Sequence, residues 1–137
     1  MMDLYAENIL EHYKNPQGKC EVRSAKCEHT EKNISCGDEI TIQLKIEDNK
    51  ISEIGWSGTG CAISQAAMSM LSAKLEGSST EEIEKLNKEE ILEMLGVPIG
   101  ISRMKCALLC LHTLKNALRI FSGEEPQSWI ETVEVSN

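Results

Sequence analysis

Residues 40–46 read Ile-Thr-Ile-Gln-Leu-Lys-Ile and carry the clearest secondary-structure signal of the chain. Apolar and polar residues alternate there, which is typical of a strand with one face buried and the other in water. Asp48-Asn49 follows, and both residue types tolerate the positive φ that a two-residue hairpin turn requires. Glu47 would then face Lys50 across the ladder as an opposite-charge pair. This stretch predicts an antiparallel hairpin.

The return strand after this turn does not keep the same alternation. Ile51 is in phase with the first strand, whereas Ile54 and Trp56 are out of phase. Either a bulge lies near residues 52–53 or both faces of the strand are covered. A weaker pattern near residues 21–30 indicates a third strand at the edge of the sheet.

Helical patterns occur on both sides of this hairpin. The spacing of apolar residues predicts long helices, and Ser79 and Asn87 begin two short ones with capping signals. The tail after Gly123 is expected to be a loop, with Trp129-Ile130 as the candidate anchor on the body. A short helix is expected over residues 3–14, and longer helices are expected over residues 61–75 and 103–121. We predict an α+β fold, one domain over residues 1–137, in which helices pack on one face of a small antiparallel sheet of about three strands.

Composition excludes several classes of function. Fourteen basic and 22 acidic residues give a net charge of −8, which argues against binding duplex nucleic acid or an anionic membrane surface. No apolar run approaches the roughly 20 residues of a membrane-spanning helix. The acidic start lacks the apolar segment of a signal peptide, so we expect a cytoplasmic protein.

Six cysteines in a reducing compartment are expected to be free thiols, whose role is metal binding, sulfur chemistry or packing. Cys36 lies in a turn before the best strand, where loops often carry exposed chemistry. Cys61 lies where a glycine-rich turn enters a helix, and a helix N-terminus favours a thiolate. Cys106 lies near the start of the last long helix, at the edge of its apolar arc. Together with Asp38, these three thiols could form one soft-metal site, although a turn thiol and a buried glycine-hinge thiol remain alternative interpretations.

The remaining cysteines and the histidine of the last helix are given no role in the site. Cys110 falls deep in the apolar arc of the last helix, which favours a core thiol. Cys20 and Cys27 lie in a weakly patterned segment and receive no site role. His112 falls on the polar side of the same helix, so we expect it to be a surface residue and not a ligand.

Four parts of the chain have a specific order and spacing: Leu4-Tyr5 to Asn15-Pro16, Cys36-Gly37-Asp38, Gly58-Thr59-Gly60-Cys61-Ala62-Ile63-Ser64, and Cys106. In this order and spacing the chain resembles the IscU/NifU/SufU family of iron–sulfur cluster scaffolds, from Leu4 to about Phe121. The resemblance implies an α+β fold and makes Cys36, Asp38, Cys61 and Cys106 the ligands. It implies a carrier, not a turnover enzyme, and a monomer or weak dimer. A cysteine desulfurase would deliver sulfur, a [2Fe–2S] cluster would be assembled, and apo iron–sulfur proteins would receive it.

Two features separate the branches of this family. IscU-like members carry His before the third cysteine, where this chain has Lys105, and residues 97–101 do not match their Leu-Pro-Pro-Val-Lys motif. Lys105 resembles the SufU branch, whose members bind zinc and relay sulfur, but the long SufU insertion before the third cysteine is absent. We expect Lys105 to act as a cation beside Cys106, or else to be a solvated lysine. Three functions follow: a cluster scaffold, a zinc-dependent sulfurtransferase partner of a desulfurase, or a zinc-stabilised structural module.

Overall fold

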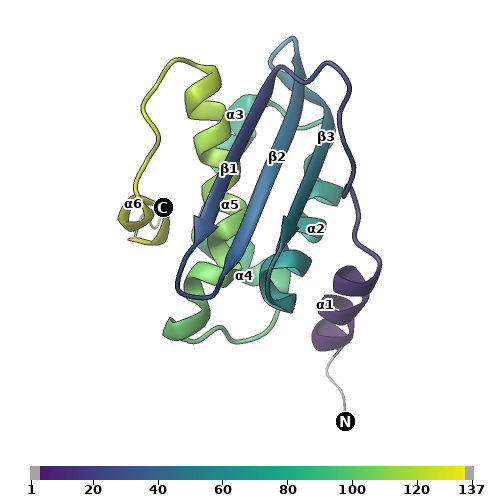
Figure 1. Cartoon of the computed structure of the whole chain (residues 1–137), viewed down its shortest axis with the longest axis vertical. Helices are drawn as coiled ribbons and strands as arrows, with labels where there is room; N and C mark the ends of the chain where they lie inside the picture. Colours follow the sequence, from purple (N-terminus) through teal and green to yellow (C-terminus); the bar gives the residue numbers. More distant parts are fainter. Residues whose placement is uncertain (1–3, 135–137) are drawn as a thin grey trace.

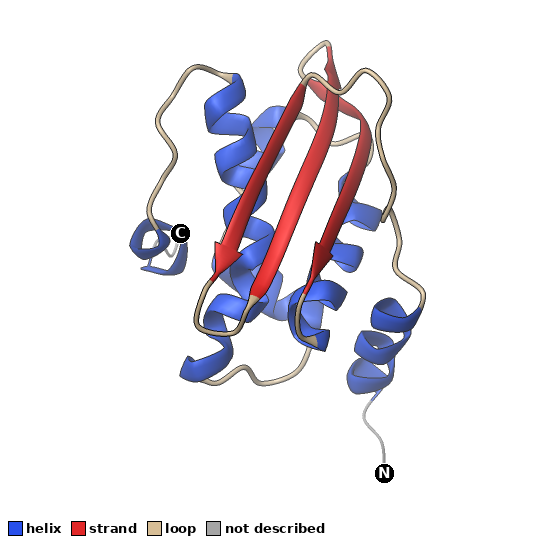
Figure 2. Ribbon diagram, in the orientation of Figure 1, coloured by secondary structure: helices blue, strands red, loops and turns tan. Residues whose placement is uncertain are grey.

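The computed structural model describes residues 4–134, in which three strands form one antiparallel sheet in the order β1-β2-β3. The strands are β1 (Cys27–Asn33), β2 (Asp38–Glu47) and β3 (Lys50–Thr59). The two longest helices, over residues 62–75 and 104–121, lie behind this sheet, and within residues 4–134 no helix covers its other face (Figures 1 and 2). The predicted α+β class, with helices on one face of a three-stranded sheet, is confirmed.

The β2–β3 hairpin forms as the alternating stretch predicts. Asp48 and Asn49 have φ values of 51° and 60°, and Glu47 pairs with Lys50. The ladder shifts register after Lys45, which pairs with Glu53 while Ile46 pairs with Ile51. Ser52 is therefore the extra residue of a bulge, which brings Ile54 and Trp56 back to the buried face.

The helices are α1 (Leu4–Lys14), α2 (Ala62–Leu75), α3 (Thr80–Glu84), α4 (Lys88–Leu95), a 3₁₀ turn η1 (Ile101–Arg103), α5 (Met104–Phe121) and α6 (Trp129–Glu134). Ser79 forms the expected capping box of α3, and the Asn87 side chain caps α4. Within residues 4–134, no helix is long and apolar enough to cross a bilayer.

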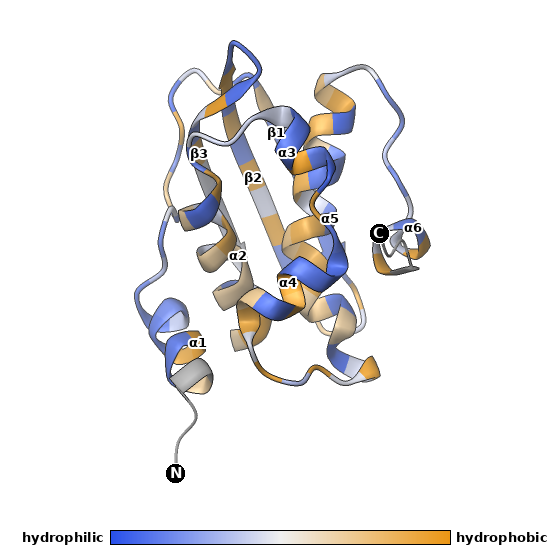
Figure 3. Ribbon diagram, turned by 180° about the vertical axis from the view of Figure 1, so that it is seen from behind, coloured by the Kyte–Doolittle hydropathy of each residue, from blue (hydrophilic) through white to orange (hydrophobic). Residues whose placement is uncertain are grey.

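The core lies between the sheet and the two central helices, α2 and α5, whose apolar sides face the strands (Figure 3). Ile40, Ile42 and Leu44 of β2 are completely buried against them. Helix α1 packs on α2, where Ile9 is buried and His12 Nδ1 lies 2.7 Å from Ser69 Oγ. This core fixes the ends of the sheet relative to the starts of α2 and α5.

Two boundaries differ from the sequence-based expectation. The edge strand runs over Cys27–Asn33 and not over residues 21–30. Its inward residues are mostly polar, so hydropathy alternation does not reveal the strand: Cys27, Glu31 and Asn33 hydrogen-bond with α5, and His29 hydrogen-bonds with Glu31. The tail after Gly123 is also more than a loop, because it contains α6.

Candidate metal and sulfur site

Several element ends meet at one end of the sheet. Strand β1 ends at Asn33, β2 begins at Asp38, β3 ends at Thr59, and both α2 and α5 begin nearby (Figure 1). The β1–β2 turn between Asn33 and Asp38 carries Cys36, and Cys61 is the N-cap residue of α2. The antiparallel topology therefore brings sequence-distant thiols to one edge of the molecule.

Cys36, Asp38 and Cys106 form a compact group at this edge. Their ligand atoms all lie within 4.8 Å of one another, and the two sulfur atoms of Cys36 and Cys106 are 3.2 Å apart. Cys36 is exposed, whereas Cys106 and Asp38 are buried. The group thus has one thiol open to a partner and a buried thiol and carboxylate beneath it.

Cys61 is connected to this group through Asp38. Its backbone N–H donates to Asp38 Oδ1 at 2.9 Å, and its sulfur lies 4.0 Å from Asp38 Oδ2. Gly60 permits this approach, because a Cβ added there would lie 2.3 Å from Asp38 Oδ1 and its φ is +147°. Of the four residues that the resemblance implies as ligands, the structure brings Cys36, Asp38 and Cys106 into one group and places Cys61 beside it, against Asp38; their binding of a metal stays a prediction.

Asn33 is a member of the site that sequence reasoning missed. Its buried side chain donates from Nδ2 to Asp38 Oδ2 at 3.4 Å and to Cys106 Sγ at 3.6 Å. Its backbone oxygen accepts the amides of Cys36 and Gly37. The only sequence signal was an asparagine three residues before Cys36, which by itself indicates no more than a turn.

The protonation of Cys106 follows from its surroundings. Burial raises the pKa of the Cys106 thiol, and the hydrogen bond with Cys36 and the nearby Asp38 raise it further. Without a cation the thiol is therefore neutral at physiological pH. A soft cation that replaces the proton would relieve the repulsion that ionised sulfur and carboxylate groups create here.

The other three cysteines take no part in this group. Cys110 is completely buried, and burial raises its thiol pKa to about 12. Cys27 is also buried, with its pKa raised to about 11 by burial, and its thiol donates to the Ala117 oxygen at 3.0 Å. Cys20 is exposed in the loop before β1. Cys110 is thus a core thiol, as its place in the apolar arc predicts, and none of the three belongs to the group of ligand atoms.

Lys105 is directed toward α6 in this structure. Its ammonium lies 5.6 Å from the centroid of the Trp129 ring, and that ring stacks on His112 with centroids 4.0 Å apart. Trp129 therefore anchors the tail, as the sequence indicated, whereas Ile130 is 67% exposed and does not. A role for Lys105 at the Cys106 sulfur requires its side chain to leave Trp129, and that role stays a prediction.

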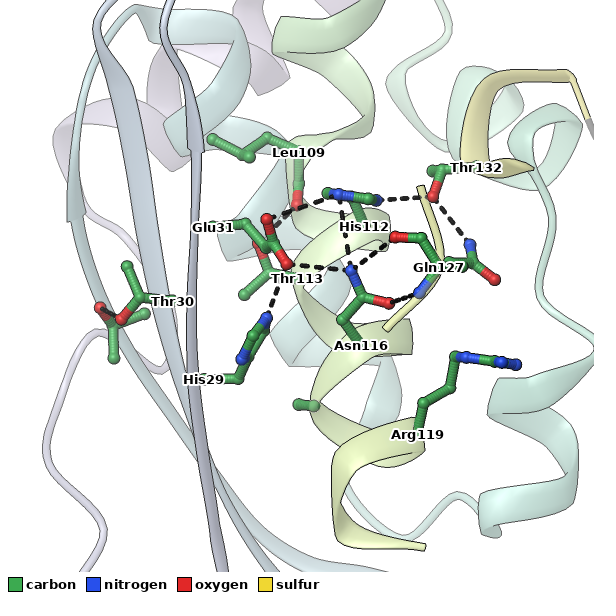
Figure 4. Close-up of polar contacts among 12 residues, drawn as sticks. His29, Thr30, Glu31, Leu109, His112, Thr113, Asn116, Arg119, Gln127 and Thr132 are labelled. Atoms are coloured by element: carbon green, nitrogen blue, oxygen red, sulfur yellow. Dashed lines mark hydrogen bonds and ion pairs between the residues drawn. The ribbon is translucent and has the colours of Figure 1, made fainter. Parts of the chain in front are cut away.

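The expectation that His112 lies on the surface is wrong. It is only 2% exposed, and it lies in a polar network between α5, β1 and the tail (Figure 4). His112 Nδ1 is 2.6 Å from Thr132 Oγ1, and its Nε2 is 3.5 Å from Glu31 Oε1. Helix α6 and Glu31 cover the polar side of α5, which a helical wheel of α5 alone cannot reveal.

Acid is expected to destabilise the fold through His112. Burial lowers its pKa from 6.5, against the opposing effect of Glu31, so the folded chain binds this proton less readily than the unfolded chain. The free energy of unfolding should therefore fall as pH drops below about 6.5, by at most about 1.4 kcal/mol per pH unit for this group. Urea unfolding at pH 7.5 and 5.5 checks this. The loss between the two pH values should be smaller in His112→Gln; an equal loss in both chains would assign the effect to other groups.

With this geometry established, comparison with known proteins identifies the family. The family described as NifU-like N terminal domain matches residues 4–127. The chain belongs to the NifU-like N-terminal domain family. A relative named iron-sulfur cluster assembly scaffold protein IscU, from Thermotoga maritima, is 33% identical, and the match covers 87% of this chain and 95% of the relative.

Two further NifU-like relatives represent the SufU branch. The zinc-dependent sulfurtransferase SufU of Bacillus subtilis is 27% identical, and the match covers 84% of this chain and 89% of SufU. The crystal structure of a putative iron-sulfur cluster assembly scaffold protein for the SUF system from Fervidobacterium islandicum superposes with a TM-score of 0.72 at 29% identity, covering 82% of this chain and 94% of that one. The iron–sulfur assembly scaffold family and its fold are thus both established for this NifU-like chain.

Proposed function

We propose that this NifU-like chain accepts sulfur from a cysteine desulfurase, holds a [2Fe–2S] cluster while it is assembled, and passes the cluster to apo iron–sulfur proteins. The observation that carries this proposal is the group of Cys36, Asp38 and Cys106 ligand atoms within 4.8 Å of one another, with Cys61 joined to Asp38. The cluster is the cargo of this process, and the chain acts as a carrier.

The donor set supports this proposal chemically. Thiolates are the ordinary ligands of iron–sulfur clusters, and three are present here with one carboxylate. A partner can reach the exposed Cys36 thiol, while burial holds the Cys106 and Asp38 side chains in place beneath it. A site that is both open on one side and built on element ends suits receipt and release of cargo.

A second function has a specific observation in its favour. Three thiolates and one carboxylate are also the kind and number of ligands that would hold Zn²⁺. The chain carries Lys105 before its third cysteine, as the SufU branch does, and it resembles a SufU described as a zinc-dependent sulfurtransferase. In that function the bound zinc would hold the thiols in place and the chain would relay sulfur from the desulfurase.

Anaerobic purification followed by metal and acid-labile sulfide analysis tests the two functions. Iron and sulfide in equal amounts, lost on exposure to air, would support the scaffold. One tightly held zinc with stimulation of a desulfurase would support the sulfurtransferase. Tight zinc without any effect on a desulfurase would contradict both and leave a zinc-stabilised structural module.

Replacement of Asp38 by alanine is expected to make the chain keep its cluster longer. An oxygen ligand matches iron in a cluster less well than a thiolate, so a cluster held partly by Asp38 should be labile. The half-time of cluster transfer to an apo acceptor should lengthen in Asp38→Ala. Because Asp38 also accepts the Cys61 amide, the melting temperature is measured in parallel. Faster transfer than in the parent chain would contradict this role, and a lower melting temperature with unchanged transfer would assign Asp38 to the turn alone.

Lys105 is expected to assist sulfur acceptance as a cation. A lysine must lose its proton before it can ligate a metal, and three thiolates with Asp38 already provide four ligands. In desulfurase-driven assembly, Lys105→Ala should therefore slow sulfur acceptance, while Lys105→Arg largely preserves it. If the Arg variant fails as severely as the Ala variant and Lys105→His restores the rate, Lys105 is a ligand instead.

A further inference from the structure

Asn33 contacts three of the four proposed ligands from a single position. Its backbone oxygen accepts the amide of Cys36 at 3.2 Å, and its side-chain Nδ2 faces Asp38 Oδ2 and Cys106 Sγ at 3.4 and 3.6 Å. The residue ends β1 and is only 3% exposed. It is therefore buried between the β1–β2 turn and the start of α5, and its contacts hold these two segments in a fixed relative position.

The amide orientation follows from chemistry. An asparagine Nδ2 can only donate, and its two hydrogens match a carboxylate oxygen and a sulfur that both accept. The reversed amide would place Oδ1 against Asp38 Oδ2, which sets two acceptors against each other. The observed orientation suits a site in which Asp38 and the Cys106 sulfur carry negative charge, as metal ligands do.

The Asp38 carboxylate has two separate supports. Oδ1 accepts from the Cys61 amide at 2.9 Å, and Oδ2 accepts from Asn33. Loss of Asn33 would leave the first support intact and free Oδ2 to rotate. The same loss would remove the N–H···S contact to Cys106, and such contacts withdraw electron density from a thiolate and tune the metal that it holds.

We propose that Asn33 is a positioning residue that orients Asp38 and Cys106 toward one bound metal and tunes the Cys106 thiolate, an inference that rests on the proposed metal binding by these residues. Asn33 itself is not a ligand, because its side chain acts as a donor to both neighbours. Its loss should change the quality of the metal site and not only the stability of the fold.

Co²⁺ is the probe, because thiolate-to-cobalt charge-transfer and d–d absorption bands report ligand geometry and electron donation. Wild type, Asn33→Leu and Asn33→Ala are loaded anaerobically with Co²⁺, and a chelator then competes for the metal. Leu is close in size to Asn, and Ala avoids overpacking should Leu fail to fold. We expect both variants to shift the charge-transfer band and to bind Co²⁺ about ten- to a hundredfold more weakly, as is usual when an outer partner of a ligand is lost.

Asn116→Leu is the matched control. Asn116 is another buried asparagine at the β1–α5 interface, but its Nδ2 donates to Glu31 and to the Gln127 oxygen and not to the site. This variant should lower the melting temperature and leave the Co²⁺ spectrum unchanged. If a folded Asn33 variant keeps the wild-type Co²⁺ spectrum and affinity, the positioning role of Asn33 is wrong, but the proposed metal binding is not affected. If wild type loaded with Co²⁺ shows no thiolate-to-cobalt bands, both the proposed metal binding and the role of Asn33 are wrong.

Discussion

Single Cys→Ser changes at positions 36, 61 and 106 are expected to abolish tight metal binding. Each replaces a thiolate by a hydroxyl that does not ionise at neutral pH. Because losing an outer partner of a ligand alone typically costs ten- to a hundredfold in affinity, we expect a loss of more than about a hundredfold here. Competition with a chromophoric chelator for Zn²⁺ measures the affinity directly.

Cys20 provides the control for this series. It is an exposed thiol in the loop before β1, outside the group at the end of the sheet, so Cys20→Ser should bind Zn²⁺ as the parent does. Retention of full affinity in any one of the three site variants would remove that cysteine from the ligand set. An equal loss in Cys20→Ser would indicate that the zinc is held elsewhere.

Gly60→Ala is expected to disrupt the same site through the backbone. The new Cβ would lie 2.3 Å from Asp38 Oδ1 and 3.0 Å from Asp38 Cα, and a φ of +147° is strained for any residue with a side chain. Strain of this kind costs about 1–3 kcal/mol, and the collision must also displace Asp38 or the Cys61 turn. We expect both a lower free energy of unfolding and a large loss of Zn²⁺ affinity.

The control for Gly60 is Gly77, which has a φ of +88° but no atom within 4 Å of an added Cβ. Gly77→Ala should lose stability from backbone strain and bind Zn²⁺ normally. If Gly60→Ala also binds Zn²⁺ normally, the close approach of Gly60 to Asp38 does not position the ligands. Comparison of urea unfolding and Zn²⁺ affinity in the two variants separates strain from loss of the site.

The central hairpin could be predicted from sequence because one face of each strand is apolar. Residues 40–46 alternate, Asp48-Asn49 fits the turn, and one bulge at Ser52 accounts for the shifted phase of β3. Strand β1 could not be placed this way, since its inward side chains are polar and are satisfied by hydrogen bonds to α5. A hydropathy pattern indicates a buried face only where the buried side chains are apolar.

The same limit explains the error about His112. The helical wheel of α5 predicts a solvated histidine, yet the tail covers it with a hydrogen bond to Thr132 and with the stacked Trp129 ring. Such cover depends on a segment that is distant in sequence. The proposed ligands, in contrast, lie beside glycines and element ends, where local sequence carries information about the turn. Asn33 lacks such a signal, because its partners come from β2 and α5.

Desulfurase-driven cluster assembly tests the account most directly. The purified chain, freed of metal, is incubated anaerobically with Fe²⁺, cysteine, a cysteine desulfurase and a thiol reductant, which supplies the electrons that convert persulfide sulfur to sulfide. It is then separated and analysed for iron, acid-labile sulfide and visible absorption. We predict two iron and two sulfide per cluster-bearing chain, with the charge-transfer bands of a [2Fe–2S] cluster, and their absence in Cys106→Ser. A wild-type chain that accepts sulfur from the desulfurase on its thiols, but emerges without iron and acid-labile sulfide, would contradict the scaffold function.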